Sequence, residues 1–214
     1  MTGILRLSSA TPAQSEFSTA WEALISDNVA ALHFPGHQSD ADQLLVFPGA
    51  FNPVHEGHLR MAELAANRIG APTHFEISVT NVDKATIDKT QALSRVQQFR
   101  GEHHVLLTRA PTFVEKAAVF PHATFVVGVD TILRIADVRY YGSTAKRDGA
   151  LASLARAGCK FVVFGRRVTG NQAQGRFHTL DDLVLPQRLA ALCHSIPEAQ
   201  FRVDLSSTEL REAE

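Results

Sequence analysis

Apolar side chains near the start of the chain recur at the spacing of an amphipathic helix. Within residues 14–33 this stripe consists of Phe17, Trp21, Leu24, Ile25, Val29 and Leu32. The spacing predicts one helix over residues 14–33. Pro35, Gly36 and the polar run after them break the pattern. We therefore expect residues 1–42 to form a helical extension before the main domain.

From residue 43 onward, short apolar runs alternate with helical patterns. The strand candidates cover residues 44–47, 74–79, 105–108, 123–127, 160–164 and 200–203. The helix candidates cover residues 56–69, 91–99, 112–120, 131–135 and 148–157, with a last helix that begins at Ser206 or Ser207. Strands rich in valine, leucine and phenylalanine that alternate with helices are typical of a parallel sheet covered on both faces. The pattern predicts a doubly wound α/β domain of five or six strands over residues 43–214.

Composition narrows the class of protein. The 214 residues are 45% hydrophobic and 20% charged, and the formal net charge is -1. A nearly neutral protein has no overall attraction for nucleic acid or for a membrane surface, so neither partner is expected. Two cysteines are too few for a disulfide framework. With no secretory signal pattern and no long apolar run, we expect a cytoplasmic protein, the nucleus being the alternative compartment.

The segment with the strongest chemical signal runs from Leu44 to His58. A buried strand ends at Gly49, where the backbone can turn tightly and approach a ligand. His55 and His58 then bracket the start of the next helix, on one face of it. A helix N-terminus offers unpaired N–H groups and a positive dipole end, which favour a phosphate. We therefore expect a phosphate-bearing ligand at this turn.

The same segment resembles a known family. Gly49-Ala50-Phe51-Asn52-Pro53-Val54-His55-Glu56-Gly57-His58 is similar to the G-x-F-x-P-x-H-x-G-H signature of the HxGH nucleotidyltransferases. Near the end of the chain, Leu205-Ser206-Ser207-Thr208-Glu209-Leu210-Arg211 resembles the family's I-S-S-T-x-I-R segment. The resemblance implies a Rossmann-like sheet with strands in the order 3-2-1-4-5. It also implies that His55 and His58 are catalytic.

The middle of the chain resembles nicotinamide mononucleotide adenylyltransferases, including their divergent eukaryotic versions. The Phe-Asn-Pro turn, the stretch Ser78–Lys84, the Gly128-Val129-Asp130 element and Arg166 are similar to segments of that branch. Tyr140 and Tyr141 stand where the branch usually has tryptophan. The resemblance implies ATP contacts from Gly49, Ala50, Phe51, His55, His58, Gly128, Asp130, Ser206, Ser207, Thr208 and Arg211. It implies acceptor contacts from Phe51, Asn52, Lys84, Tyr140, Tyr141 and Arg166.

We therefore expect adenylyl transfer from ATP to nicotinamide mononucleotide or nicotinate mononucleotide. The triphosphate is expected to bring Mg²⁺ with it, because no carboxylate cluster indicates a protein metal site. Three alternatives stay open at this point: a different phosphate acceptor, CTP as the donor, or nucleotide binding without turnover. Whether the chain forms a homo-oligomer is also left open.

Overall fold

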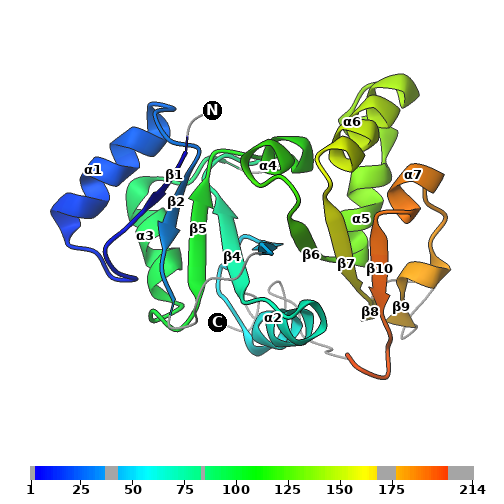
Figure 1. Cartoon of the computed structure of the whole chain (residues 1–214), viewed down its shortest axis with the longest axis horizontal. Coiled ribbons are helices and arrows are strands. Elements are labelled where there is room, and N and C mark those ends of the chain that lie inside the picture. Colours follow the sequence, from blue (N-terminus) through cyan, green and yellow to red (C-terminus); the bar gives the residue numbers. More distant parts are fainter. Residues whose placement is uncertain (1–2, 37–42, 83–84, 168–176, 202–214) are drawn as a thin grey trace.

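An eight-stranded sheet forms the centre of the molecule (Figure 1). The computed structural model describes residues 3–36, 43–82, 85–167 and 177–201. In chain order the strands of this sheet are β1 (Ile4–Arg6), β2 (Ala31–Phe34), β3 (Leu45–Pro48), β4 (Thr73–Ser78), β5 (His104–Thr108), β6 (Thr124–Gly128), β7 (Lys160–Phe164) and β10 (Cys193–Ile196). Their spatial order is β1-β2-β5-β4-β3-β6-β7-β10. A separate ribbon pairs β8 (Arg166–Arg167) with β9 (Phe177–His178).

The five central strands follow the predicted order 3-2-1-4-5, because they run β5-β4-β3-β6-β7 in space. All four pairs among them are parallel. The chain leaves β3 in one direction and returns to the sheet as β6 on its other side. In doubly wound sheets, ligands bind beyond the carboxyl ends of the strands at such a switch point. A ligand site is therefore expected at the carboxyl ends of β3 and β6. The predicted Rossmann-like α/β class is confirmed.

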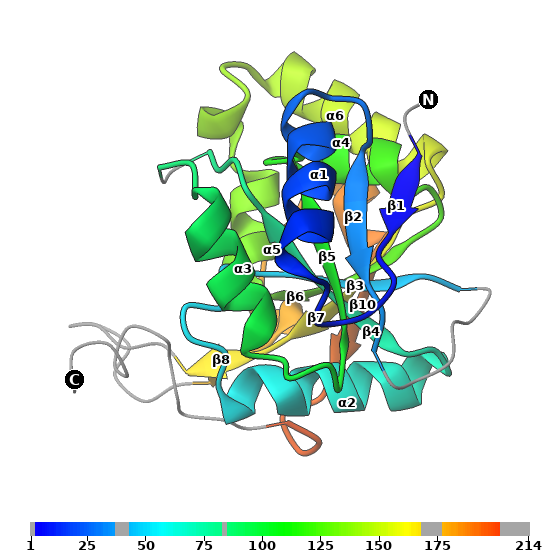
Figure 2. The ribbon, with the colours of Figure 1, turned by 90° about the vertical axis from the view of Figure 1, so that its left-hand side faces the viewer.

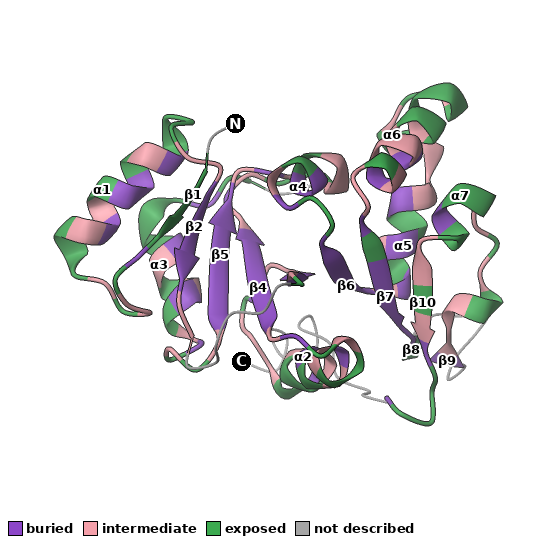
Figure 3. Ribbon diagram, in the orientation of Figure 1, coloured by how far each residue is buried: buried purple, intermediate pink, exposed green. Residues whose placement is uncertain are grey.

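Helices cover both faces of the sheet, each over its own apolar core. One core contains side chains of α1 (Gln14–Ile25), α2 (Glu56–Ile69) and α3 (Lys89–Gln97). The other contains side chains of α4 (Phe113–Val119), α5 (Val129–Ala136), α6 (Thr144–Arg156) and α7 (Gln187–Ala190). Figure 2 shows α1 and α3 together on one side of the edge strand β1 and its neighbour β2. In Figure 3 the central strands are buried, while the outer surfaces of the helices are exposed.

Local signals account for several helix boundaries. Asp88 and Thr112 cap the first turns of α3 and α4, where each side chain accepts a backbone N–H. Gly70 ends α2 with φ 76°, a left-handed conformation that glycine adopts without strain. Among the described residues, we find no helix with the length and apolarity that crossing a bilayer requires.

The N-terminal segment differs from its prediction. Helix α1 ends at Ile25, and Asp27 adopts a positive φ of 61° in the turn that follows. Residues Ala31–Phe34 then form β2, antiparallel to β5, so the predicted helix over residues 14–33 is wrong beyond Ile25. Leu32 fitted the helical spacing, but the decisive pattern is alternation: Leu32 and Phe34 face one core while Ala31 faces the other. The extension thus adds β1 and β2 to the same sheet.

The predicted sixth strand also lies elsewhere. Residues 193–196 form β10, parallel to β7, whereas the prediction covered residues 200–203. Gln200 lies in a turn, and its backbone N–H donates to the carbonyl oxygen of Pro197. Residues 202 and 203, and the helix predicted to begin at Ser206 or Ser207, lie outside the described residues.

A buried ion pair joins the sheet to α4. Glu76 on β4 is fully buried, and Lys116 on α4 is 4% exposed. The Lys116 ammonium donates to both carboxylate oxygens of Glu76, at 2.8 and 2.7 Å, and to the carbonyl oxygen of Ala110 at 2.7 Å. Thr108 of β5 donates a further hydrogen bond to Glu76. Buried charges are tolerated when they are paired and hydrogen-bonded in this way.

Candidate active site

The turn after β3 is built around a close contact between Gly49 and the Phe51 ring. The Gly49 N–H donates to the backbone oxygen of Glu76 on β4 at 2.9 Å, which anchors the start of the turn to the sheet. A Cβ atom at Gly49 would lie 2.5 Å from Cζ of Phe51. No real Cβ tolerates that distance, so this packing requires a residue without a side chain.

The Phe51 side chain belongs to the core. It is 1% exposed and packs edge-on against the rings of Phe47, Phe75, Phe99 and His58. Its backbone has a positive φ of 43°. Phe51 was predicted to contact ATP and the acceptor, but its ring is buried in the protein interior. Only the backbone of Phe51 remains able to contact a substrate, whereas Asn52 beside it is exposed.

Two side chains at the C-terminal end of α3, Arg95 within the helix and Gln98 at its C-cap, hold this turn, and the sequence analysis did not single them out. Gln98 donates to the carbonyl oxygen of Phe51 at 3.0 Å and accepts the Val54 N–H at 2.9 Å. Arg95 donates to the carbonyl oxygen of Ala50 at 3.2 Å, and burial lowers the pKa of its guanidinium. Nothing in a polar helix face identifies such contacts, because they depend on how α3 packs against the turn.

His55 and His58 lie together at the start of α2. His55 is the N-cap of the helix, and its backbone N–H donates to Nδ1 of His58 at 3.3 Å. The two rings stack, with centroids 3.7 Å apart and planes 25° apart. Because Nδ1 of His58 accepts this bond, the proton of the neutral ring sits on Nε2. His58 can therefore act as a hydrogen-bond donor without carrying a charge.

The electrostatics of the pair keep it neutral. Burial, and then the neighbouring His55, lower the pKa of His58 to about 4. Burial also lowers the pKa of His55. Two stacked cations would repel each other, so neither ring is readily protonated in the protein without ligand. An anion placed across both rings would reverse that preference, which makes the pair suited to a phosphate.

A second group of predicted residues lies at the end of β6, the neighbour of β3 in the sheet. Gly128 is the N-cap of α5, and a Cβ atom built on it would meet no atom within 4 Å. Asp130 lies in the first turn of α5 and forms an ion pair with Arg166 of β8. Both side chains are about half exposed. The structure thus pairs a residue predicted to bind ATP with one predicted to bind the acceptor.

The two predicted tyrosines follow α5 and differ in their surroundings. Tyr140 ends the short helix η1 (Val138–Tyr140) and is 42% exposed, with the Arg134 guanidinium 5.9 Å from its ring centroid. The Tyr141 hydroxyl donates to the carbonyl oxygen of Ile135 at 3.0 Å, and burial raises its pKa. Tyr140 is therefore the ring that is accessible for stacking on a substrate.

Five predicted site residues lie outside the described residues: Lys84, Ser206, Ser207, Thr208 and Arg211. Their predicted contacts with the triphosphate and the acceptor stay predictions. The described part of the site thus comprises the turn after β3, the histidine pair at the start of α2, and Gly128, Asp130 and Arg166 at the end of the neighbouring strand β6.

Comparison with known proteins fits this geometry. A family model described as cytidylyltransferase-like matches residues 46–213, well over half of the chain. The chain belongs to the cytidylyltransferase-like family. The match includes both the histidine segment and the Leu205–Arg211 segment. The expected HxGH-type relationship is therefore confirmed at the level of this family, and the protein is a nucleotidyltransferase. A comparison with curated proteins found no match.

Proposed function

We propose that the protein transfers the adenylyl group of ATP to nicotinamide mononucleotide or nicotinate mononucleotide, giving the dinucleotide and pyrophosphate. The observation that carries the proposal is the stacked His55/His58 pair at the N-terminus of α2, next to the switch point of the sheet. The choice of ATP and of the acceptor rests on the Phe51-Asn52-Pro53 turn and on the resemblance of the middle segments.

In the proposed reaction, a phosphate oxygen of the mononucleotide attacks the α-phosphorus of ATP. The bond from that phosphorus to the bridging oxygen of the β-phosphate breaks, and pyrophosphate leaves with the bonding electrons. Charge grows on the oxygens around the α-phosphorus as this happens. Nε2–H of His58 donates to one of these oxygens, and the N-terminus of α2 contributes its dipole. Phosphoryl-type transfer needs positioning and charge stabilisation, without a protein nucleophile.

Substrate binding in this scheme opens the Asp130–Arg166 ion pair. Asp130 exchanges Arg166 for a ribose hydroxyl of ATP, and Arg166 turns to the phosphate of the acceptor. An exposed ion pair contributes only about 0–1 kcal/mol, so a bound phosphate readily replaces the carboxylate. Both residues are about half exposed, which is compatible with this exchange. The donor is the magnesium complex of ATP, so Mg²⁺ enters as part of the substrate.

The direct test is to incubate the purified full-length protein with ATP, Mg²⁺ and nicotinamide mononucleotide. Pyrophosphate and NAD are then measured in the same reaction, with nicotinate mononucleotide and CTP in parallel reactions. We expect equal amounts of pyrophosphate and dinucleotide with ATP, and little of either with CTP. Turnover with CTP alone would replace the proposed donor. Pyrophosphate release with neither mononucleotide, but with another phosphate acceptor, would replace the proposed acceptor.

Replacing His58 tests the catalytic assignment. We expect His58→Ala to lower kcat for pyrophosphate release by about 10²–10³-fold, the usual effect of removing one donor to a developing charge. Binding of ATP, measured by calorimetry, should change far less. Arg68→Gln, at the exposed far end of the same helix, is the matched control and should keep full kcat. If His58→Ala turned over at the wild-type rate, the proposed role of the pair would be wrong.

A further inference from the structure

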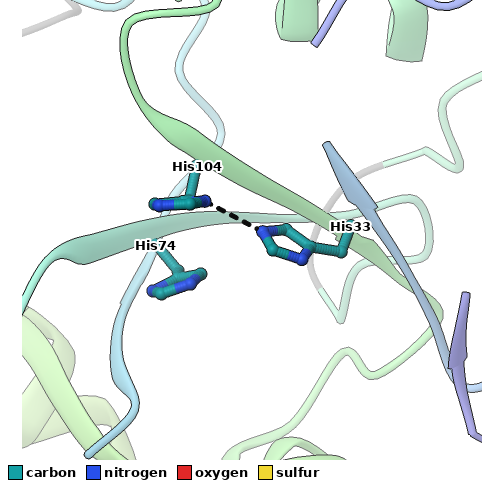
Figure 4. Close-up of side chains that lie close together, drawn as sticks. All are labelled: His33, His74 and His104. Atoms are coloured by element: carbon teal, nitrogen blue, oxygen red, sulfur yellow. Dashed lines mark hydrogen bonds between the residues drawn. The ribbon is translucent and has the colours of Figure 1, made fainter. Parts of the chain in front are cut away.

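Three buried histidines from separate strands meet on the face of the sheet that α4 covers (Figure 4). His33 lies on β2, His74 on β4 and His104 on β5. The three side chains are 7%, 5% and 1% exposed, in that order. His74 and His104 lie at the amino ends of their strands, whereas the active-site turn follows the carboxyl end of β3. The cluster therefore lies at the opposite end of the parallel strands from His55 and His58.

The rings are arranged so that their nitrogens converge. One nitrogen from each histidine lies within 4.8 Å of the other two. The centroids of His74 and His104 are 4.5 Å apart in a stacked arrangement, and those of His33 and His104 are 5.1 Å apart. Three imidazoles that converge in this way place a ring nitrogen from each close enough to share one ligand.

The backbone around the cluster fixes the protons. Gly36 N–H donates to Nδ1 of His104 at 3.0 Å, so this nitrogen carries no proton. Nε2 of His33 lies 3.0 Å from the same nitrogen, and it must therefore be the donor between these two rings. Nδ1 of His74 lies 3.2 Å from the carbonyl oxygen of Pro72, which can only accept. Nδ1–H of His74 is thus held by the backbone, and its lone pair is on Nε2.

For His74 this is the arrangement that metal-binding histidines use, with one ring nitrogen held by a backbone carbonyl and the other able to bind an ion. The nearest acidic side chain on this face of β4 is Glu76, whose carboxylate is taken by Lys116 and Thr108. The ligand set consists of imidazole nitrogens. Such a set suits Zn²⁺ and similar transition-metal ions, whereas Mg²⁺ and Ca²⁺ prefer oxygen ligands.

We propose that His33, His74 and His104 form a binding site for one divalent transition-metal ion of the Zn²⁺ type. The separation of 3.0 Å between the His33 and His104 nitrogens is close to the roughly 3.3 Å expected between two nitrogens bound to one Zn²⁺ at about 2.0–2.1 Å. The ion takes the place of the hydrogen bonds that converge on Nδ1 of His104. His33 then holds its proton on Nδ1 and presents the Nε2 lone pair.

The site joins the N-terminal extension to the main sheet. His33 belongs to β2, while His74 and His104 belong to strands of the family-matched segment. Because the cluster is buried and lies away from the active-site turn, the ion has a structural role. It fastens an outer strand to two central ones, and its binding free energy stabilises that attachment.

Metal content of the full-length protein tests the proposal. The protein is stripped with a chelator, dialysed against micromolar Zn²⁺, and analysed for zinc per chain by atomic emission. Two variants remove a ligand but keep its hydrogen bond: the His33→Gln amide can still donate to His104, and the His74→Asn amide can still donate to Pro72. Circular dichroism establishes that each variant is folded. The exposed strand residue His194 supplies the control variant His194→Gln.

The histidine pair of the active site could also take up zinc, so a His55→Gln/His58→Gln variant is analysed in parallel. We expect one Zn²⁺ per chain in the wild type, in the His194 variant and in the His55/His58 variant. His33→Gln and His74→Asn should weaken zinc binding by more than about 100-fold, the upper end of the loss seen when only a supporting group is removed. Their unfolding midpoints should no longer rise with added Zn²⁺.

Other results would overturn the site. A wild-type protein that holds no zinc after dialysis has no such site, and zinc lost with His55 and His58 belongs to the active site. Variants that fold and bind zinc as the wild type does would exclude His33 and His74 as ligands. If either variant fails to fold, Co²⁺ in the wild type decides: a nitrogen-bound tetrahedral ion gives strong visible absorption. Weak absorption typical of a hydrated ion contradicts the proposal.

Discussion

His55 and His58 stack because the first turn of α2 places side chains three residues apart on one face. Burial lowers the pKa of both rings, and the neighbouring His55 lowers that of His58 further. A neutral His58 ring with its proton on Nε2 is a donor that does not depend on pH near neutrality. The same two residues that receive the triphosphate in our proposal therefore also make the stability of the protein depend on pH.

The pH dependence has a definite sign. The pKa of His58 falls from 6.5 to about 4 on folding, so between these values the unfolded chain binds more protons than the folded one. We expect the free energy of unfolding to be constant with respect to His58 above pH 6.5 and to fall as the pH drops towards 4. In this range, unfolding of His58→Gln should take up roughly one proton fewer than unfolding of the wild type. Urea titrations at several pH values measure the slope.

Leu59→Gln is the control for that titration, because Leu59 is an exposed residue of the same helix and does not titrate. Its slope should match the wild type. A wild-type slope in His58→Gln as well would mean that the ring is not buried as the structure has it.

A second prediction at the scale of single residues concerns Gly49. The Cβ atom of Gly49→Ala would lie 2.5 Å from the Phe51 ring, which is itself held in the core. We expect a loss of about 1–3 kcal/mol in the free energy of unfolding, as for other overpacked sites. Gly149→Ala, inside α6 with nothing within 4 Å of the added atom, should instead gain about 0.5–1 kcal/mol. Denaturant titrations compare the two, and equal effects would contradict the packing described here.

At the scale of elements, the ion pair between β4 and α4 sets the position of that helix. We expect Lys116→Met to cost about 3–5 kcal/mol in the free energy of unfolding, because it leaves the Glu76 carboxylate buried without its counter-ion. Glu76→Gln/Lys116→Met should recover most of this loss, since the amide is neutral and can accept from Thr108. Denaturant midpoints of the two variants measure the difference.

The exposed pair Arg60–Glu63 on α2 is the matched control. Removing its cation with Arg60→Met should cost less than about 1 kcal/mol, as is usual for surface ion pairs. A similar loss from Arg60→Met and Lys116→Met would show that burial of the β4–α4 pair does not determine the loss in the free energy of unfolding.

The sequence predicts an element well when a local pattern determines its structure. It predicts an element poorly when packing against a distant segment determines the structure. The central strands and α2 were predicted well, because buried parallel strands and amphipathic helices leave a local pattern. The prediction failed at β2, where Leu32 satisfied the helical spacing but its pairing with β5 decided the structure. Strand β1 has three exposed residues and leaves no pattern to read.

The candidate site divides in the same way. The glycine turn and the histidine pair are contiguous in the sequence, and their spacing indicated phosphate binding. Arg95 and Gln98 support that turn from another helix, so only the fold reveals them. The histidines at 33, 74 and 104 come from three strands that are far apart in the chain. Their meeting depends on strand order, which no single segment encodes.

At the scale of the whole molecule, the N-terminal extension is part of the sheet. Phe17 and Leu24 of α1 are 1% and 0% exposed, and Phe34 of β2 packs against Phe17 with ring centroids 6.0 Å apart. Removing residues 1–42 would uncover this core and the hydrogen-bonding edge of β5. We expect the truncated chain to aggregate, or to unfold without a cooperative transition, in size-exclusion and denaturation experiments.

Ile25→Gln is the control for this truncation, since Ile25 is on α1 but 40% exposed. It should leave the denaturant midpoint close to that of the wild type. A truncated protein as stable as the full chain would mean that the extension and the remaining residues fold independently.

The antiparallel pairing of β2 with β5 has a consequence for synthesis. The ribosome releases β2 before β5. Strand β5 ends at Thr108, which is translated much later than β2. At about 5–20 residues per second, the nascent chain waits roughly 4–15 s between the two. During that interval Phe17, Leu24 and Phe34 have no sheet to cover them. The segment of α1 and β2 is therefore made well before β5, and it is exposed to chaperones on the ribosome during that interval.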